Sequence, residues 1–300
     1  MKILITGATG LVGRILIKQL LFEGHDINFL TSRKNAINSL IGCKGYYWNI
    51  NEQLIDSSCI AGVEKIIHLA GANVSNKWST SYKNEIINSR VHSSKLLFET
   101  LKSNKNQVNQ LVSASAIGIY KNSLTTVYNE ESTVFSEAFL GEVVQKWEAS
   151  ISVFSKLNIK VAKVRIGVVL SSSGGALEKI IQPIKLGLGA PLDSGNQVMS
   201  WIHISDLSQL ILFLMHENKN GVFNAVAPNP VTNSELTKKI ASKLNKPLFL
   251  PNVPKFVLKL MLGEMHQIVC ESQNVSSKKV ENNGFSFQYK TIDRALDSLL

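Results

Sequence analysis

The stretch ITGATGLVG, residues Ile5 to Gly13, sets the expected fold of this chain. It follows the apolar run KILIT (2–6), which is typical of a buried parallel strand. It leads into a helical pattern from Leu11 to Leu21. A strand, a glycine turn and a helix in this order are typical of a dinucleotide-binding unit.

The three glycines of this stretch each have a predicted task. Gly7 permits a tight turn, Gly10 allows the backbone to approach a pyrophosphate, and Gly13 allows the helix to pack closely on the sheet. The N–H groups of Gly10, Leu11 and Val12 are then expected to face an anion at a helix N-terminus. The spacing is G-x-x-G-x-x-G rather than the standard G-x-G-x-x-G, so a glycine turn without a ligand is the alternative.

Short β-rich runs alternate with helical patterns through the first half of the chain. This alternation predicts βαβ units and an α/β fold with a Rossmann-type, doubly wound parallel sheet. We expect a nucleotide-binding domain over 1–170, with strands also contributed by about 200–227, and a smaller α+β substrate-side region over 171–300. All seven prolines lie at or after Pro183, in the second region. The expected strands are 26–31, 46–50, 63–71, 108–120 and 159–170, and the expected helices are 79–103 and 137–156.

The end of the second strand indicates which dinucleotide is bound. A site for NAD is expected to carry an acidic residue there, which grips the ribose 2′-hydroxyl. This strand instead ends in FLTSRK, where Ser32 and Arg33 suit a 2′-phosphate. The prediction is therefore NADP(H), and the alternative is that Arg33 and Lys34 are a solvated loop pair.

Composition narrows the function classes. The net charge of +10 is spread without a basic run, so no nucleic-acid partner is expected. The longest apolar run is about half the length that a bilayer requires, so no membrane partner is expected. The three cysteines are far apart and form no metal-ligand motif, which favours reduced thiols, no metal and a cytoplasmic location.

Several motifs together resemble the extended, epimerase-like branch of the short-chain dehydrogenase/reductase superfamily. They are TGATGLVG, HLAGANV (68–74) and VSASAIGIY (112–120). RIGVVLSSSGGAL (165–177), IKLGLGAPLDSGNQVMSWIHISD (184–206) and LMLGEMHQIV (260–269) further resemble a subgroup of NADP-binding epimerase-family proteins with a C-terminal domain of unknown function. The resemblance covers nearly the whole chain.

This resemblance implies a set of cofactor-binding residues. Thr9 to Val12 would line the pyrophosphate, Ser32 and Arg33 the 2′-phosphate, and Leu69 and Ala70 the adenosine side. Glu85, Arg90 and Arg165 match further cofactor positions of the subgroup. The alternative for the two arginines is a structural salt bridge, such as Arg90 with Glu85.

The catalytic pair of the superfamily is missing. The superfamily uses a Tyr-x-x-x-Lys pair, and no tyrosine here is followed four residues later by lysine. Extended members carry a glutamate about one turn after the lysine, and Glu148 matches it. Counting back from Glu148 puts Val144 at the lysine position and Leu140 at the tyrosine position. Ser115 matches the superfamily's catalytic serine, and Tyr120 is the candidate substitute acid. His203 and Asp206 form a second candidate pair, although Asp206 or Ser205 is more simply a helix N-cap.

Three functions remain open at this point. The first is an NADP-dependent oxidoreductase or epimerase-like enzyme that acts on a small molecule, with the substrate unidentified. The second is a non-catalytic NADP(H)-binding sensor or scaffold, and the third, suggested by charge alone, is a nucleic-acid-associated protein. We expect a monomer or a homodimer, and the family resemblance implies that a homodimer would pair through the helices at 79–103 and 137–156.

Overall fold

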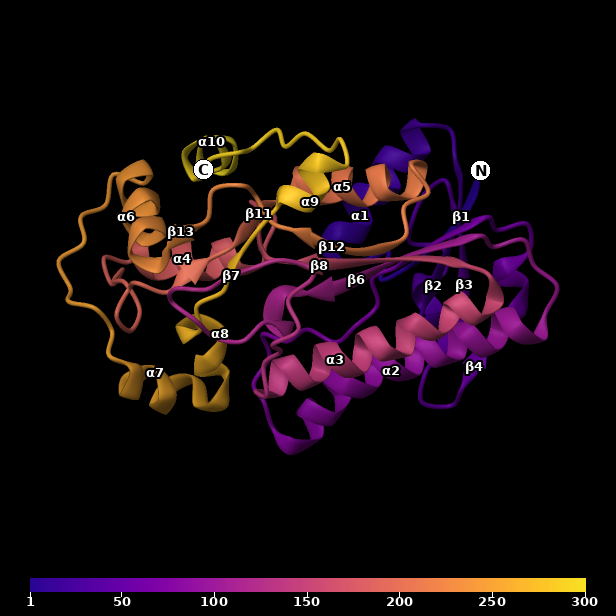
Figure 1. Cartoon of the computed structure of the whole chain (residues 1–300), viewed down its shortest axis with the longest axis horizontal. Coiled ribbons are helices and arrows are strands. Elements are labelled where there is room, and N and C mark those ends of the chain that lie inside the picture. The colour runs from indigo at the N-terminus through magenta and orange to yellow at the C-terminus, as the bar shows by residue number, and fades with distance from the viewer.

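A computed structural model describes all 300 residues. Its centre is an eight-stranded sheet in the order β12-β8-β6-β5-β1-β2-β3-β4 (Figure 1). Every neighbouring pair is parallel except β3 and β4. This is the predicted Rossmann-type fold. The strands are β1 (Lys2–Thr6), β2 (Asp26–Thr31), β3 (Cys43–Asn49), β4 (Leu54–Ile55), β5 (Lys65–His68), β6 (Gln110–Ala116), β8 (Lys160–Ile166) and β12 (Gly221–Ala225).

Helices cover both faces of this sheet, and each face has its own apolar core. α1 (Leu11–Phe22) and α5 (Ile204–His216) pack on one face, where Leu16, Leu20 and Ile211 belong to a cluster of 24 buried residues. α2 (Thr80–Ser103) and α3 (Phe139–Ser152) pack on the other face, above a cluster of 20 buried residues (Figure 1). The central strands are buried from both sides, which explains their continuous apolar sequence.

The remaining elements form a smaller region beside the carboxyl edge of the sheet (Figure 1). Three two-stranded sheets join β9 (Val168–Leu170) with β11 (Trp201–His203), β10 (Val198–Met199) with β13 (Val231–Thr232), and β7 (Val127–Tyr128) with β14 (Asn274–Val275). Its helices are α4 (Ala176–Lys185), α6 (Asn233–Lys243), α7 (Lys255–Leu262), α8 (His266–Cys270) and α10 (Ile292–Leu299). Short 3₁₀ turns lie at Lys34–Ala36, Ser57–Ile60, Ile117–Ile119, Val153–Leu157 and Gly263–Met265.

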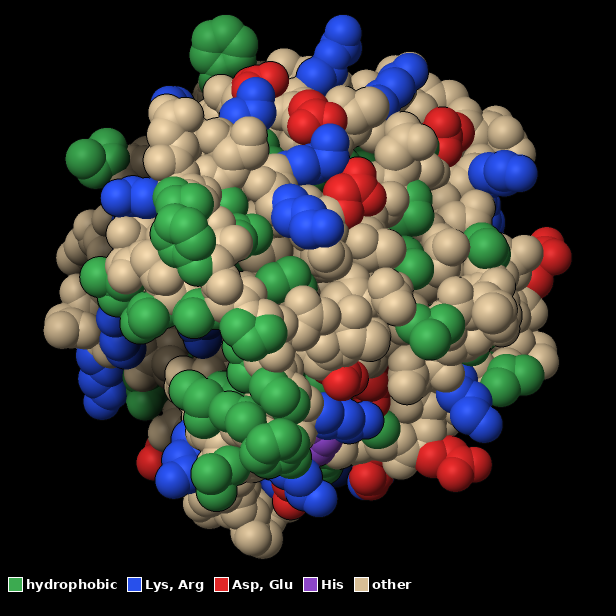
Figure 2. All heavy atoms as spheres, turned by 90° about the vertical axis from the view of Figure 1, so that its left-hand side faces the viewer, with side chains coloured by type: hydrophobic (Ala, Val, Ile, Leu, Met, Phe, Trp, Pro, Cys, Tyr) green, Lys and Arg blue, Asp and Glu red, His purple; other side chains and the backbone are tan.

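The end of the chain returns to the large sheet. α9 (Lys278–Asn282) packs near β12, and Phe285 and Phe287 are buried in the same core cluster as α1 and α5. Figure 2 shows the opposite end of the molecule, where hydrophobic side chains gather on the surface. Exposed apolar residues of that region include Leu186, Leu188, Phe249, Phe256, Leu260 and Met261.

The structure departs from the predicted strand over 159–170 at one residue. Gly167 lies between β8 and β9. A Cβ atom there would lie 2.4 Å from the carbonyl oxygen of Ser200, so the position requires glycine. The chain turns at this glycine, and β9 leaves the large sheet to pair with β11. The three cysteines form no disulfide. None of the helices combines the length and the apolar character needed to cross a membrane.

Candidate functional site

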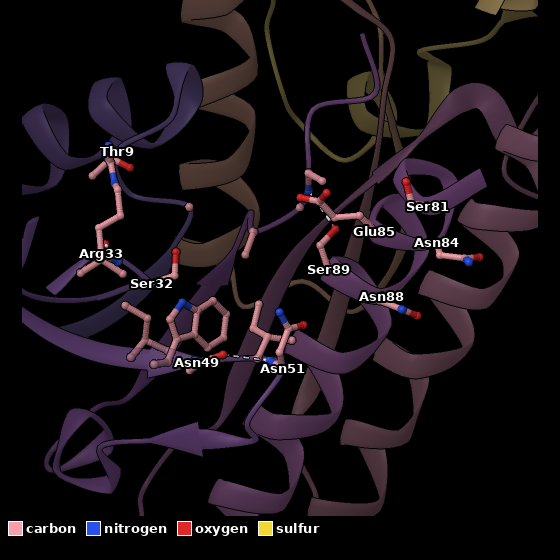
Figure 3. A pocket seen from close by; sticks show the side chains of 18 residues that line it. Thr9, Ser32, Arg33, Asn49, Asn51, Ser81, Asn84, Glu85, Asn88 and Ser89 are labelled. Atoms are coloured by element: carbon pink, nitrogen blue, oxygen red, sulfur yellow. Dashed lines mark hydrogen bonds between the residues drawn. The ribbon is translucent and has the colours of Figure 1, made fainter. Parts of the chain in front are cut away.

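A cavity of about 620 Å³ opens where β1, β2, β3 and β5 end, beside the first turns of α2 (Figure 3). The carboxyl edge of a parallel sheet is where α/β folds bind ligands. Most of the lining side chains are polar. The lining residues are Gly7, Thr9, Leu30, Thr31, Ser32, Arg33, Trp48, Asn49, Ile50, Asn51, Ala70, Gly71, Ala72, Ser81, Asn84, Glu85, Asn88 and Ser89.

The N-terminus of α1 points free backbone donors toward this edge. No side chain caps the helix, and its first turn carries no acidic residue. The N–H groups of Leu11 and Val12 have no hydrogen-bond partner in the structure, which suits an anion. The predicted free N–H at Gly10 was wrong, because this N–H donates to the carbonyl oxygen of Gly7 at 3.0 Å; the approach of the Gly10 backbone to a pyrophosphate stays a prediction.

Two of the glycines are required by close backbone approach. Gly7 has a φ of +70°, and a Cβ atom there would lie 2.8 Å from the carbonyl carbon of Leu69. A Cβ atom on Gly13 would lie 2.4 Å from the carbonyl oxygen of Gly7. Distances below 3.0 Å are steric overlaps, so both positions exclude larger residues. Gly7 therefore allows the predicted tight turn, and Gly13 allows the predicted close packing of α1.

Thr6 joins the ends of β1 and β5 behind this turn. Its hydroxyl oxygen accepts hydrogen bonds from the N–H groups of Leu69 and Ala70, each at 3.1 Å. It also lies 2.7 Å from Nδ1 of His68. Because the hydroxyl already accepts twice, its own proton is directed at Nδ1, and His68 is neutral. Of the two residues predicted for the adenosine side, Ala70 lines the cavity, whereas Leu69 packs into the core.

Ser32 and Arg33 lie at one end of the cavity with Thr9, away from Ser81 and Asn84 at the other (Figure 3). Both side chains are exposed, and Arg33 forms no ion pair. Its N–H donates to Oγ1 of Thr31 at 3.2 Å, which orders the backbone at the end of β2. An unpaired guanidinium at the cavity wall is suited to bind a phosphate.

Arg90 is a half-buried cation without a carboxylate partner. Its guanidinium donates to the carbonyl oxygens of Ile86 and Ala72, at 2.9 and 3.1 Å, and stacks on the ring of Trp147. Burial lowers the pKa of Arg90 to about 10. The alternative pairing with Glu85 does not form; Glu85 lines the cavity, whereas Arg90 lies outside its lining, so its role toward the cofactor stays a prediction.

Arg165 is placed differently. Its Nε and Nη2 donate to the two carboxylate oxygens of Glu148 at 2.8 and 3.0 Å, and its Nη1 donates to the hydroxyl of Tyr120 at 2.9 Å. Arg165 does not line the cavity. Burial alone would raise the pKa of Glu148, but the hydrogen bonds and charge of Arg165 outweigh burial and leave it lowered. The structural salt bridge considered for Arg165 is therefore present, and its role toward the cofactor stays a prediction.

The two candidate catalytic residues belong to the same buried network. Ser115 donates to Glu148 Oε1 at 2.6 Å, and Tyr120 donates to Oδ1 of Asn224 at 2.8 Å. Tyr120 is fully buried, and burial raises its pKa although Arg165 lies beside it. Neither residue lines the cavity. Ser115 and Tyr120 therefore lie in a buried network outside this cavity, and their catalytic roles stay predictions.

The other candidate pair is also structural. Nδ1 of His203 accepts from the N–H of Ser205 at 3.1 Å, so His203 is the N-cap of α5. The predicted cap at Asp206 or Ser205 was wrong. Asp206 instead accepts from the N–H groups of Gln288 and Tyr289, each at 2.9 Å, and so ties the returning chain to α5. Burial lowers the pKa of His203 to about 4.

Sequence reasoning missed the third wall of the cavity. Asn49, the last residue of β3, and Ile50 and Asn51 after it line the cavity, and Asn51 N–H donates to Asn49 Oδ1 at 3.1 Å (Figure 3). The signal was available, because polar residues at the carboxyl end of an expected strand lie on the ligand edge of a parallel sheet. On α2, the sequence indicated Glu85 but not its neighbours Ser81 and Asn88.

Comparisons with known proteins agree with this architecture. Residues 3–226 match the NAD dependent epimerase/dehydratase family, and residues 253–299 match a domain of unknown function, DUF1731. The chain is 36% identical to a chloroplastic epimerase family protein of Arabidopsis thaliana, a homologue of SDR39U1, over all of this chain and 87% of that protein. It is 34% identical to an epimerase family protein of Staphylococcus epidermidis, over all of this chain and 99% of that protein.

A solved structure extends the comparison to three dimensions. The human epimerase family protein SDR39U1 (isoform 2), crystallised with NADPH, matches with a TM-score of 0.86 and 27% identity, over all of this chain and 99% of that one. Sequence, domain order and fold thus point the same way. The chain belongs to the NAD dependent epimerase/dehydratase family, in the epimerase-like group that carries the DUF1731 domain at its C-terminal end.

Proposed function

We propose that this chain is an NADP(H)-binding, epimerase-like protein that holds the cofactor in the cavity at the carboxyl edge of the sheet. The observation that carries the proposal is the unpaired Arg33 beside Ser32 at the cavity wall, where an NAD site would place an acid. The human relative solved with NADPH supports the same choice of cofactor.

The residues present suit the cofactor from end to end. The free N–H groups of Leu11 and Val12 would bind the pyrophosphate. Gly7 and Gly13, where a Cβ atom would overlap the neighbouring backbone, keep the turn compact enough for that approach. Ser32 and Arg33 would bind the 2′-phosphate. Arg90 adds a positive charge close to Gly71 and Ala72, with no carboxylate to neutralise it.

A bound nicotinamide would supply hydride transfer, as in an oxidoreductase or epimerase-like reaction on a small molecule. The reaction would also need a proton donor. The superfamily's tyrosine and lysine positions carry Leu140, which is half-buried, and Val144, which is buried, and neither can donate a proton. A proton donor would have to come from the polar side chains that face the cavity, or from the substrate.

The lack of the superfamily's proton-transfer residues favours a second function. Aliphatic residues at both proton-transfer positions, together with the burial of Ser115 and Tyr120, suit a non-catalytic NADP(H)-binding sensor or scaffold. In such a protein the cofactor would bind and remain unreacted.

Calorimetric titration with NADPH tests the shared part of both functions. One NADPH bound per chain supports the proposal, and absence of binding overturns it. Mixing the loaded protein with a panel of carbonyl compounds and nucleotide sugars then separates the two. Net loss of NADPH absorbance with any compound, or conversion of a nucleotide sugar to its epimer at constant absorbance, selects the enzyme; an unreacted cofactor and unchanged compounds across the panel select the sensor or scaffold.

A further inference from the structure

A cluster of metal-ligating side chains lies outside the nucleotide cavity, at the C-terminal ends of α1 and α5. It consists of Glu23, His25 and His216, which each offer one ligand atom within 4.8 Å of the others. Glu23 Oε2 lies 3.0 Å from Nε2 of His216 and 3.2 Å from Nε2 of His25. Residues nearly 200 positions apart in the sequence therefore meet at one point.

The backbone fixes this meeting point. α1 ends with Gly24 at a φ of +77°, and the N–H of His25 donates to the carbonyl oxygen of Leu20. α5 ends the same way, with Asn218 at a φ of +49°. Both endings are compact left-handed caps, and the two helices pack together through the core. The cluster is thus carried by rigid elements rather than by a mobile loop.

Two of the three ligand-atom distances in the cluster suit a tetrahedral ion. Zinc with nitrogen and oxygen ligands at 2.0–2.1 Å has ligand atoms about 3.3 Å apart along each edge of the tetrahedron. Both measured distances to Glu23 are close to this value. A hydrogen bond accounts for His216, whereas Nε2 of His25 is buried and has no hydrogen-bond partner.

The electrostatics at this point favour a cation. The C-terminal ends of two helices each carry partial negative charge from their aligned peptide dipoles, and Glu23 adds a full negative charge. The ion pairs of Glu23 involve only the two histidines, with no lysine or arginine to occupy the carboxylate.

We propose that Glu23, His25 and His216 bind one divalent transition-metal ion of the zinc type, with water at the fourth position. Two imidazoles and one carboxylate are a common zinc ligand set. Closing on the ion requires rotation of Glu23 and His216, whose side chains are more than a third exposed, while His25 is already held in place. The ion would join the C-terminal end of α1, whose other end faces the nucleotide cavity, to α5.

The test is zinc titration of the metal-free full chain in competition with a chromogenic chelator. We expect one zinc per chain, and at least a tenfold loss of affinity in His25→Ala and in His216→Gln. His216→Gln keeps a hydrogen-bond donor for Glu23 and lies at an exposed position, so folding is preserved. His266→Ala, on α8, is the matched control and is expected to bind zinc like the natural chain.

Cobalt in place of zinc identifies the ligands. The predicted result is the visible absorption of tetrahedral cobalt with nitrogen and oxygen ligands. A thiolate charge-transfer band would place the metal on a cysteine and overturn the proposal. Binding well below one ion per chain, unchanged affinity in His216→Gln, or an equal loss in His266→Ala would overturn it as well.

Discussion

Arg165 and Glu148 form a two-point ion pair inside the protein, with donor–acceptor distances of 2.8 and 3.0 Å. The two side chains are 4% and 10% exposed, so water does little to weaken the attraction. Ser115 and Tyr120 complete their hydrogen bonds. The pair joins α3 to β8 inside the protein.

Removing one partner of this ion pair should destabilise the protein strongly. Glu148→Ala leaves Arg165 buried without a carboxylate, and Arg165→Leu leaves Glu148 with only the more distant Lys163 at 3.9 Å, so each change costs about 3–5 kcal/mol. The free energy of unfolding from urea titration measures the loss. Glu142→Ala, whose ion pair with Lys146 is exposed, is the control and should change the free energy of unfolding by less than about 1 kcal/mol. Equal small losses in all variants would contradict a buried network.

Gly13→Ala should weaken both the fold and nucleotide binding. The added Cβ overlaps the carbonyl oxygen of Gly7 at 2.4 Å and forces α1 away from the turn. Overpacking of this kind costs about 1–3 kcal/mol. Gly118→Ala is the control, because its Cβ would meet Leu140 at 3.7 Å, an ordinary contact. Thermal unfolding with and without NADPH checks both effects, and an unchanged Gly13→Ala would refute the close approach.

Stability should fall with pH below about 6.5 because of His68. Burial lowers the pKa of His68 to about 4, whereas an unfolded histidine titrates near 6.5. Between these values the unfolded state binds the extra proton, so the stabilisation is complete above about 6.5 and is lost as the pH falls toward 4.

Substitution isolates the contribution of His68 to this pH dependence. His68→Gln should flatten part of the slope of unfolding free energy against pH, measured in urea between pH 7 and about 4. His92→Gln, on α2 and outside the Thr6 network, should leave the slope unchanged. The same slope in His68→Gln as in the natural chain would show that His68 is not the titrating group.

Arg90→Met should reduce NADPH affinity while leaving the chain folded. Arg90 has no carboxylate partner to strand, unlike Arg165, and methionine keeps apolar contact with Trp147. A charge-assisted hydrogen bond is worth about 1.5–3 kcal/mol, which corresponds to a loss of about 10- to 100-fold. Arg294→Met, exposed on α10, is the control for calorimetry. Full affinity in Arg90→Met would remove Arg90 from the site.

The central architecture could be predicted because it depends on local patterns. The glycine turn, the apolar strands and the helices at Leu11–Phe22 and Thr80–Ser103 each have a short-range signature in the chain. The order of the strands then follows from the general rules for βαβ units. The break at Gly167 could not be predicted, because it depends on the carbonyl oxygen of Ser200, which packs there only in the folded state.

The site was predicted in part, for the same reason. Thr9, Ser32 and Arg33 follow strand ends and were predicted, whereas Asn49 ends and Asn51 follows a strand that the sequence marks only weakly. The partner of Arg165 lies 17 residues away on another element, and no spacing rule connects the two. Likewise Asp206 looked like a helix cap, although its acceptors are used by Gln288 and Tyr289, far along the chain.

The most direct measurement of the central claim is a paired titration with NADPH and NADH. It compares the natural chain with Arg33→Ala and with the control Lys34→Ala. In the natural chain the ammonium of Lys34 lies over the ring of Tyr47 and not in the cavity wall. The account predicts tighter binding of NADPH than of NADH, loss of most of that difference in Arg33→Ala, and no change in Lys34→Ala. Equal affinity for the two nucleotides, or a preference that survives Arg33→Ala, would contradict it.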